Sequence, residues 1–288
     1  MKTKKNTAVL LISCADSDGI IAAVTALLSR LGANILHMDQ YVDRDNSMFF
    51  MRVEWDLEKF SIDCSDFETI FKHEVAKKYS MDWNIYLSEK KQRMAIFVSK
   101  IGHCFFDLIS SWRNSNLDVD IPLIISNHKD YEDDAKRYNI PFVHLPVNKD
   151  NREEMAIKQL ELLEEQKIDF IVLARYMQII PESIIGAYSN KIINIHHSFL
   201  PSFPGAKPYH QAFDKGVKIT GATAHFVTAE LDEGPIIEQD IQRVNNKFSV
   251  DELIRTGQDV EKRVLTSAVI SHIDRKILVY NNRTVVFS

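Results

Sequence analysis

The chain contains 288 residues, 45% of them hydrophobic and 26% charged, and carries a formal net charge of −5. This length suffices for two domains with their own cores, and the composition is that of a folded globular protein rather than a disordered one. Acidic and basic residues are mixed along the chain, with no basic stripe of the kind that binds a phosphate backbone. The charge pattern therefore argues against a nucleic-acid partner.

The cysteines and the apolar runs indicate the cellular compartment in which the protein is expected. Cys14, Cys64 and Cys104 show no CxxC spacing, which argues against a disulfide framework or a structural zinc site and favours a reducing cytoplasm. The apolar run 8–14 follows basic residues as in a lipoprotein signal, but its core of some six residues falls short of the roughly 7–15 that a signal needs. We expect a buried strand there. No other run approaches the ~18 apolar residues of a membrane span, so we expect no membrane partner.

The first 87 residues predict a small module of strands and helices. Strands are expected at 7–14, 34–42, 47–55 and 82–87, and helices at 19–31 and 65–79. This βαββαβ order is typical of a ferredoxin-like fold. Asp16 or Asp18 is expected to cap the first helix. A charged stretch then marks a boundary, so we predict a first domain at 1–87, a linker at 88–93 and a second domain at 94–288.

From residue 94 onward, strands alternate with helices. We expect strands at 94–99, 121–126, 142–145 and 169–174, and helices at 105–112, 133–138 and 153–166. The run 169–174 is almost entirely apolar, as in a central parallel strand that is buried on both faces. The region therefore predicts a doubly wound, Rossmann-like α/β sheet, in which ligands bind beyond the carboxyl ends of the strands.

The end of the chain predicts a long helix and a hairpin. Ser249 and Glu252 have the spacing of a capping box, and the helix that they begin is expected to end near Arg275. Two β-like segments follow at 277–280 and 283–287. Asn281 and Asn282 separate them, as in a hairpin turn.

Three polar residues predict acyl chemistry. Asn194 and His196 lie two apart in an extended run, so they project to the same side of a strand, and Asp232 occupies a Leu-Asp-Glu-Gly turn. An amide can hold a developing oxyanion, an imidazole can move a proton, and a carboxylate can activate a nucleophile. The same three residues are a poor metal-ligand set, because a third strong donor is missing. We therefore expect neither a metal nor a cofactor.

Three spaced motifs, at 193–205, 220–227 and 231–237, resemble the folate-dependent formyltransferase family, and the resemblance covers residues 94–240. The resemblance implies that Asn194, His196 and Asp232 are the catalytic residues and that the segment 173–180 lines a folate pocket. The residues expected to bind the substrate are Arg175, Met177, Gln178, Ile180, His225 and Val227.

The first domain resembles an ACT domain, a small ligand-sensing module, through its segments 16–20 and 31–35. Asp18 stands where that family commonly has a proline. An N-terminal ferredoxin-like ACT domain ahead of a formyltransferase domain is similar to the architecture of the formyltetrahydrofolate deformylase family. The resemblance implies hydrolysis of 10-formyltetrahydrofolate to tetrahydrofolate and formate, which supplies formate for purine synthesis and balances the one-carbon folate pool. It also implies a homo-oligomer and an amino-acid effector, with methionine activating and glycine inhibiting.

The residues at the first strand-to-helix junction of the second domain indicate whether the formyl acceptor is water or an amine. Transfer to a phosphorylated amine requires a phosphate cradle of glycines and backbone N–H groups at the first strand-to-helix junction. Here the junction 99–106 has one glycine, Gly102, and bulky neighbours, which favours an occluded site and water as the acceptor. Lys100 and His103 keep a phosphate site open as an alternative. The competing hypotheses are therefore a transferase acting on a ribotide or an aminosugar nucleotide, and a regulatory folate-binding protein with an inert site.

The expected mechanism is direct attack of water on the formyl carbon. Asp232 positions and activates the water, directly or through His196, while His196 and Asn194 stabilise the oxyanion. His197 is expected to face away from His196 as a packed residue, and His210 to lie on the surface. Arg175 and Lys207 could each contact the glutamyl tail of the folate. The alternative for Arg175 is an ordinary salt bridge, and the alternative for Lys207 is a solvated side chain.

Overall fold

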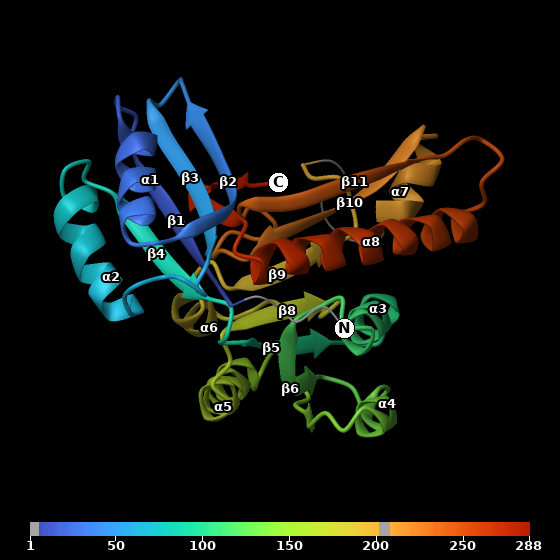
Figure 1. Cartoon of the computed structure of the whole chain (residues 1–288). Coiled ribbons are helices and arrows are strands. Elements are labelled where there is room, and N and C mark those ends of the chain that lie inside the picture. The colour runs from blue at the N-terminus through green and yellow to red at the C-terminus, as the bar shows by residue number, and fades with distance from the viewer. Residues whose placement is uncertain (1–5, 202–207) are drawn as a thin grey trace. The chain divides into compact units, whose positions relative to one another are not determined.

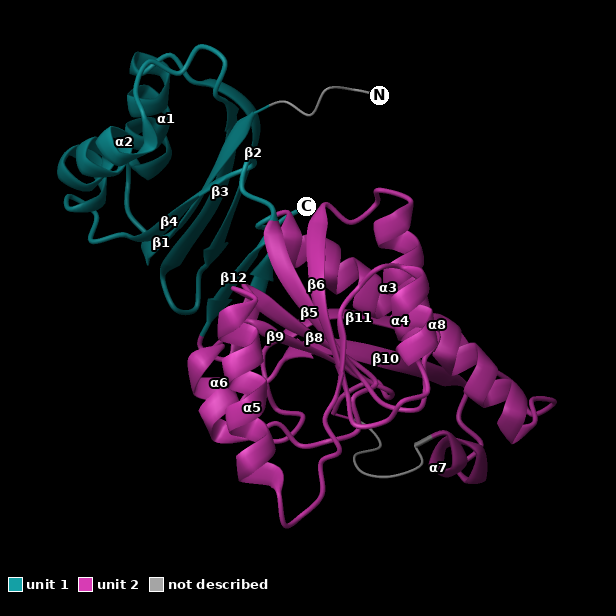
Figure 2. Ribbon diagram, turned by 90° about the horizontal axis from the view of Figure 1, so that it is seen from below, with its two compact units in different colours: residues 1–91, 275–280, 285–288 teal, residues 92–274, 281–284 magenta. Residues whose placement is uncertain are grey.

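The computed structural model describes residues 6–201 and 208–288 of the chain. Lys207 and the motif residues 202–205 lie outside the described residues. The chain forms two compact units: unit 1 comprises 1–91, 275–280 and 285–288, and unit 2 comprises 92–274 and 281–284 (Figure 2).

Unit 1 has the predicted βαββαβ order. Its elements are β1 (Thr7–Ala15), α1 (Ile20–Arg30), β2 (Asn34–Asp43), β3 (Met48–Asp56), α2 (Cys64–Phe71), a π-helical turn η1 (Lys72–Ala76) and β4 (Asp82–Leu87). The four strands form an antiparallel sheet in the order β2-β3-β1-β4, which is the ferredoxin-like arrangement (Figure 1). The predicted fold of this domain is confirmed.

Both faces of the unit 1 sheet are covered at β1. Alternate residues of β1, such as Leu10 and Ile12, pack with the apolar faces of α1 and α2. Val9 and Leu11 point to the opposite face, where Phe287 from the end of the chain packs on them. The last strands of the chain are therefore part of the core of unit 1.

Two helix boundaries in unit 1 differ from the expectation. Neither Asp16 nor Asp18 caps α1; the N-cap is Gly19, which has φ = 85° and no side-chain cap. This left-handed conformation suits glycine and supplies the turn into the helix. The predicted helix at 65–79 is α2, which ends at Phe71 and continues as the turn η1.

Unit 2 holds a seven-stranded sheet. Its elements are β5 (Gln92–Val98), α3 (His103–Arg113), β6 (Val119–Ser126), α4 (Glu132–Arg137), β7 (Phe142–His144), α5 (Arg152–Glu165), β8 (Phe170–Ala174), α6 (Glu182–Ala187), β9 (Ile192–His196), α7 (Pro208–Asp214), β10 (Ile219–Phe226), β11 (Ile236–Arg243) and α8 (Val250–Ile273). The strand order is β11-β10-β9-β8-β5-β6-β7, parallel from β9 to β7 and antiparallel at β10 and β11. The strand order reverses between β5 and β8, as in doubly wound sheets.

Helices cover both faces of this sheet. Buried residues of α5 and α6, such as Leu163 and Ile184, share a core with β5, β6 and β8. On the other face α8 runs alongside β10 and β11 and contacts α3 (Figure 1). The predicted capping box begins α8: the Ser249 hydroxyl accepts from the Glu252 N–H at 3.2 Å, and the Glu252 carboxylate accepts from the Ser249 N–H at 2.7 Å. The predicted doubly wound fold is confirmed, with two antiparallel strands at one edge.

The two units divide the chain differently from the predicted domains. Gln92 and Arg93 were expected in the linker 88–93, yet they pair with Val119 and Asp120 as the start of β5. The second domain was expected to run to residue 288, but 275–280 and 285–288 group with unit 1 because their apolar side chains pack on its sheet. Between β12 (Ile277–Tyr280) and β13 (Arg283–Val286), Asn281 and Asn282 have φ of 45° and 55°, which is typical of a type I′ hairpin turn.

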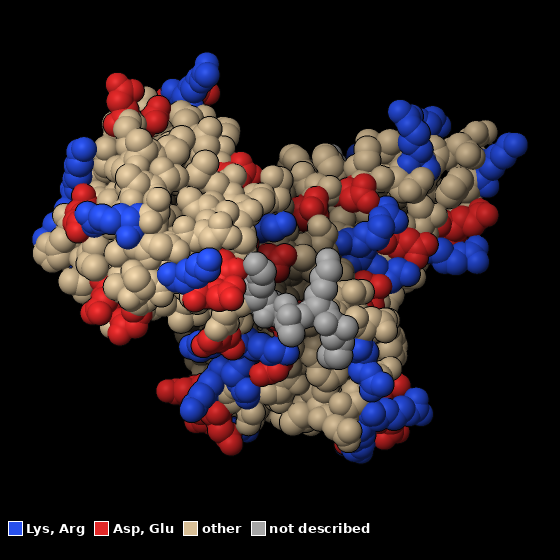
Figure 3. Space-filling model, viewed as in Figure 1, with Lys and Arg blue, Asp and Glu red and all other residues tan. Residues whose placement is uncertain are grey.

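Surface and thiol features add three observations. In the part of the chain that the structure describes, no helix combines the length and the apolar composition needed to cross a membrane. On the face seen in Figure 3, Lys and Arg side chains are interspersed with Asp and Glu. All three cysteines are free, with Cys14 and Cys104 buried.

Candidate active site

Unit 2 contains a cavity of about 620 Å³ at the carboxyl ends of its parallel strands. Asn194, His196 and Asp232 all line it. So do the six residues expected to bind the substrate, namely Arg175, Met177, Gln178, Ile180, His225 and Val227. The cavity lies beside the point where the strand order reverses, which is where doubly wound folds bind their ligands.

β9 positions Asn194 and His196. Its side chains alternate between the two faces of the sheet, so Ile193 and Ile195 are buried in the core, at 0% and 3% exposure, and anchor the strand. The neighbouring antiparallel strand β10 places His225 directly opposite Asn194. The cross-strand register therefore brings a third polar side chain to the site.

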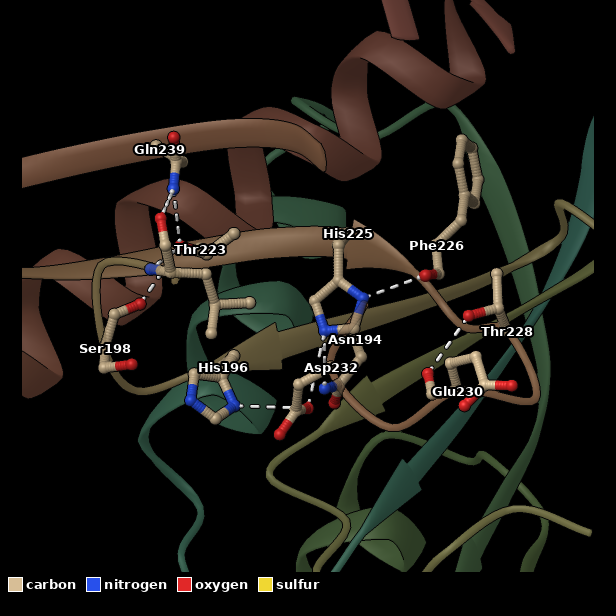
Figure 4. A network of polar contacts seen from close by, with 11 residues as sticks. Asn194, His196, Ser198, Thr223, His225, Phe226, Thr228, Glu230, Asp232 and Gln239 are labelled. Carbon is tan, nitrogen blue, oxygen red and sulfur yellow. Dashed lines mark hydrogen bonds and ion pairs between the residues drawn. The ribbon is translucent and has the colours of Figure 1, made fainter. Parts of the chain in front are cut away.

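His225 fixes the orientation of the Asn194 amide. Its Nδ1 lies 2.8 Å from the carbonyl oxygen of Phe226, which can only accept, so Nδ1 carries the proton. Burial lowers the pKa of His225, which keeps the ring neutral and leaves Nε2 as an acceptor. The Nδ2 group of Asn194 donates to this nitrogen at 3.2 Å (Figure 4). The arrangement leaves the second N–H of the amide for a substrate oxygen.

Asp232 and His196 form a hydrogen bond at the cavity. Nδ1 of His196 lies 3.3 Å from Oδ1 of Asp232 (Figure 4). The hydrogen bond from His196 is the largest of the effects that hold the pKa of Asp232 below its usual value, so the carboxyl group is ionised at neutral pH. Among the described residues, Nε2 of His196 is buried and has no hydrogen-bond partner. This nitrogen is therefore free to bond to a substrate.

The turn that carries Asp232 is held tightly against β10. Asp232 has φ = 59°, a left-handed conformation that aspartate tolerates better than most residues. A Cβ atom on Gly234 would lie 1.8 Å from the carbonyl oxygen of Phe226, so only glycine fits at this close approach. The Phe226 N–H also donates to the carbonyl of Pro235 at 2.9 Å. These constraints fix the place of the carboxylate.

The junction between β5 and α3 is filled by an aromatic cluster. The Tyr131 hydroxyl donates to the carbonyl of Lys100 at 2.6 Å, and its ring lies so close that a Cβ on Gly102 would be 2.4 Å from it. The rings of Phe105 and Phe106 each lie 5.4 Å from that of Tyr131. Tyr131, which comes from a separate loop, thus occupies the space beside Gly102, while Ile101 and His103 of the same junction line the cavity.

Sequence reasoning missed Glu261 of α8, which is fully buried beside the cavity. Its carboxylate contacts His103 Nε2 at 2.9 Å, accepts from the Tyr209 hydroxyl at 2.5 Å and lies 3.5 Å from Nε of Arg175. Burial acts to raise the pKa of Glu261, but the bond to His103 and the charge of Arg175 outweigh it and hold the pKa below its usual value. The sequence signal that could have identified Glu261 is its position next to Val260 on the apolar stripe of the helix, where a charged residue is unusual.

The prediction that His197 faces away from His196 was wrong. β9 ends at His196, so the alternation of faces stops there, and His197 lines the same cavity with its ring 5.2 Å from that of His196. Burial, reinforced by the charge of Arg175, lowers the pKa of His197 to about 4. His210 is exposed, as expected, and also lines the cavity.

One group of side chains has metal-ligand atoms close together. Atoms of His103, Cys104 and Glu261 lie within 4.8 Å of one another. Burial raises the pKa of the Cys104 thiol, however, and metals bind the thiolate. His103 and Glu261 already bond to each other, so this group is better described as part of the buried network around Glu261.

The chain has two units, and an amide, an imidazole and a carboxylate lie at the strand ends of its doubly wound domain. Comparison with known protein families shows which class of protein has this combination. A family model described as "Formyl transferase" matches residues 92–269, and one described as "ACT domain" matches residues 8–54. The chain is thus a formyl transferase family protein with an ACT domain.

More specific relatives narrow the family. A formyltetrahydrofolate deformylase from Synechocystis is 46% identical over 98% of this chain and 99% of its own. The crystal structure of a formyltetrahydrofolate deformylase from Pseudomonas syringae superposes with a TM-score of 0.96 at 41% identity, covering 100% of this chain and 96% of that one. Glycinamide ribonucleotide transformylase 1 from Symbiobacterium toebii matches only 71% of this chain, with 98% of its own covered, at 28% identity and a TM-score of 0.64. The chain belongs to the formyltetrahydrofolate deformylase family.

Proposed function

We propose that the protein hydrolyses 10-formyltetrahydrofolate to tetrahydrofolate and formate. The observation that carries the proposal is the ionised Asp232 beside a His196 whose second nitrogen is unpartnered among the described residues, in one cavity with an oriented Asn194 amide. Membership of the deformylase family supports it. The residues present supply every role that hydrolysis requires, so the proposal includes no metal or cofactor.

In the proposed mechanism water attacks the formyl carbon. Asp232, whose side chain is 25% exposed, accepts a proton from the water as the new C–O bond forms. The N–H of Asn194 and a protonated His196 stabilise the oxyanion. The C–N10 bond then breaks, N10 takes a proton from His196, and formate leaves. Asp232 then loses the proton that it took from the water and His196 regains one, which restores both groups. In the net reaction one proton of the water is on the amine of tetrahydrofolate, and the other leaves with the ionisation of formic acid.

Water rather than an amine is the proposed acceptor. A ribotide requires backbone N–H groups and open space for its phosphate at the junction after β5. Tyr131 occupies the space beside Gly102, the one glycine of that junction, and His103, which kept a phosphate site open, bonds to the buried Glu261. No observation favours transfer to an amine.

The folate is proposed to lie against the segment after β8. Met177, Ile179 and Leu231, which are 56%, 55% and 67% exposed, all line the cavity, and grouped apolar side chains of this kind suit contact with a flat ring system. Gln178, Ile180 and Val227 are proposed to complete the contact. His225 is proposed to act on the substrate through Asn194, because its two nitrogens already have partners.

Wider roles follow from the same proposal. We infer that the formate supplies purine synthesis and that hydrolysis balances the one-carbon folate pool. The match of residues 8–54 to an ACT domain supports regulation by a small ligand. We propose that methionine activates, that glycine inhibits, and that these modules pair into a homo-oligomer. Three free cysteines suit a reducing cytoplasm.

The test is formate release from 10-formyltetrahydrofolate with no added acceptor. Asn194→Ala is expected to lower kcat by about 10²–10³, because one oxyanion donor is lost, with little change in folate binding. Asn114→Ala, at an exposed position after α3, is the matched control and should behave as wild type. Formate release that needs an added amine, or a normal rate for Asn194→Ala, would contradict the proposal.

A further inference from the structure

Arg175 places a buried cation in the wall of the cavity. Its side chain is 8% exposed, and within the described ranges neither Nε nor Nη1 has a hydrogen-bond partner. Nε lies 3.5 Å from Oε2 of Glu261, which makes an ion pair without a hydrogen bond. A buried N–H without an acceptor is costly, and more so when the donor is ionised. The guanidinium group is therefore suited to take an acceptor from the cavity.

The backbone places Arg175 next to the reacting groups. It follows the last residue of β8 directly, with φ = 62°. β8 runs parallel to β9, with Leu173 aligned with Asn194, so Arg175 and His196 each lie two residues further along adjacent strands. Adjacent strands are about 4.8 Å apart, which sets the backbone of Arg175 roughly one strand spacing from that of His196.

Glu261 restrains the guanidinium without satisfying it. One carboxylate oxygen of Glu261 bonds to His103 and the other to Tyr209. The carboxylate thus balances the charge of Arg175, while its own hydrogen-bonding capacity is directed elsewhere. An anion in the cavity would complete the hydrogen bonds that Glu261 does not provide.

We propose that Arg175, held by Glu261, is the binding site for the formate anion. The inference rests on the proposed hydrolysis, which generates formate in this cavity. A planar guanidinium group matches the geometry of a carboxylate better than an ammonium group does. The formyl group of the substrate is neutral, so a charged ligand group for Arg175 arises in the cavity only when the product forms. Asp232 and Glu261 lie nearby and carry the same negative charge as formate. Their repulsion keeps the product from binding too tightly to leave.

The carboxylates of the folate's glutamyl tail are the competing occupants. Burial of Arg175 argues against them, because such a tail extends towards solvent, whereas the arginine side chain is 8% exposed. Formate has the size and charge for an enclosed position of this kind.

Direct binding of ¹³C-labelled sodium formate, measured by NMR line broadening at constant ionic strength with sodium chloride, tests the site without turnover. Arg175→Lys keeps the charge beside Glu261 but loses the planar donor group. The double variant R175Q/E261Q removes both charges and so leaves no unpaired buried charge. Both are expected to weaken formate binding about tenfold or more, the loss of one charge-assisted hydrogen bond. Arg243→Gln removes an exposed arginine of β11 and should bind formate as wild type does.

Each outcome decides the proposal. Weaker formate binding in folded Arg175 variants, together with weaker inhibition of turnover by added formate, supports it. Wild-type protein that binds no formate, or Arg175 variants that bind it equally well, would overturn it. A raised KM for 10-formyltetrahydrofolate with unchanged formate binding would assign Arg175 to the glutamyl tail instead. Failure of wild-type protein to release formate from the folate contradicts the proposed function alone, because the binding measurement contains no folate.

Discussion

His197 offers a quantitative test of the electrostatics of the cavity. Burial and the neighbouring Arg175 lower its pKa from 6.5 to about 4. Between these pH values the unfolded chain binds a proton at His197 and the folded chain does not. The free energy of unfolding therefore falls as the pH drops from 6.5 towards 4, and the contribution is complete above 6.5.

The size of the effect follows from the shift. One pKa unit corresponds to about 1.36 kcal/mol, so His197 should lower the free energy of unfolding of wild-type protein by about 2–3 kcal/mol between pH 7.5 and pH 4.5. His197→Gln binds no proton at this position, so its free energy of unfolding should fall by about 2–3 kcal/mol less than that of wild type over the same interval. The lowered pKa of His225 acts in the same direction in both proteins and cancels in the comparison.

The measurement is urea unfolding of wild type and His197→Gln at the two pH values, followed by circular dichroism, with the transition of unit 2 fitted separately. His210→Gln, at an exposed position of the same cavity, is the control and should keep the pH dependence of wild type. Equal losses in wild type and His197→Gln would refute the reasoning, since they would mean that His197 takes up a proton as readily in the folded protein as in the unfolded one.

Three further predictions concern positions around the site and the last helix. Gly234→Ala should lower the free energy of unfolding by at least about 1–3 kcal/mol, because its Cβ would clash with the Phe226 carbonyl, whereas Gly186→Ala has open space and should not destabilise; thermal unfolding compares them. Ser249→Ala removes a helix cap and should cost about 1 kcal/mol in urea unfolding, with Ser249→Asp restoring it. His225→Phe frees the Asn194 amide and should lower kcat more than it raises KM; equal effects on both would count against an orienting role.

Much of the fold could be predicted because its signals are local. A continuous apolar run marks β1, alternation of apolar and polar residues marks β9, and the spacing of Ser249 and Glu252 marks the start of α8. The failures are also local in origin. The alternation that placed Asn194 and His196 on one side was extended to His197, where the strand has already ended. In the sequence, Glu261 is one of several polar residues of α8, and its burial could not be predicted, because it depends on how the helix packs against the sheet.

Patterns among residues that are neighbours in the chain were enough to predict the two folds, the polar residues at the end of β9 and in the Leu-Asp-Glu-Gly turn, and the low glycine content of the β5–α3 junction. The surroundings of these features became known from the packing of the folded chain. Tyr131 packs beside Gly102, 29 residues earlier in the chain, and Glu261 contacts Arg175, 86 residues earlier. Such contacts depend on how distant elements pack, and no local pattern of residues encodes that packing. The buried pair of Arg175 and Glu261, on which the proposed formate site depends, belongs to this second kind.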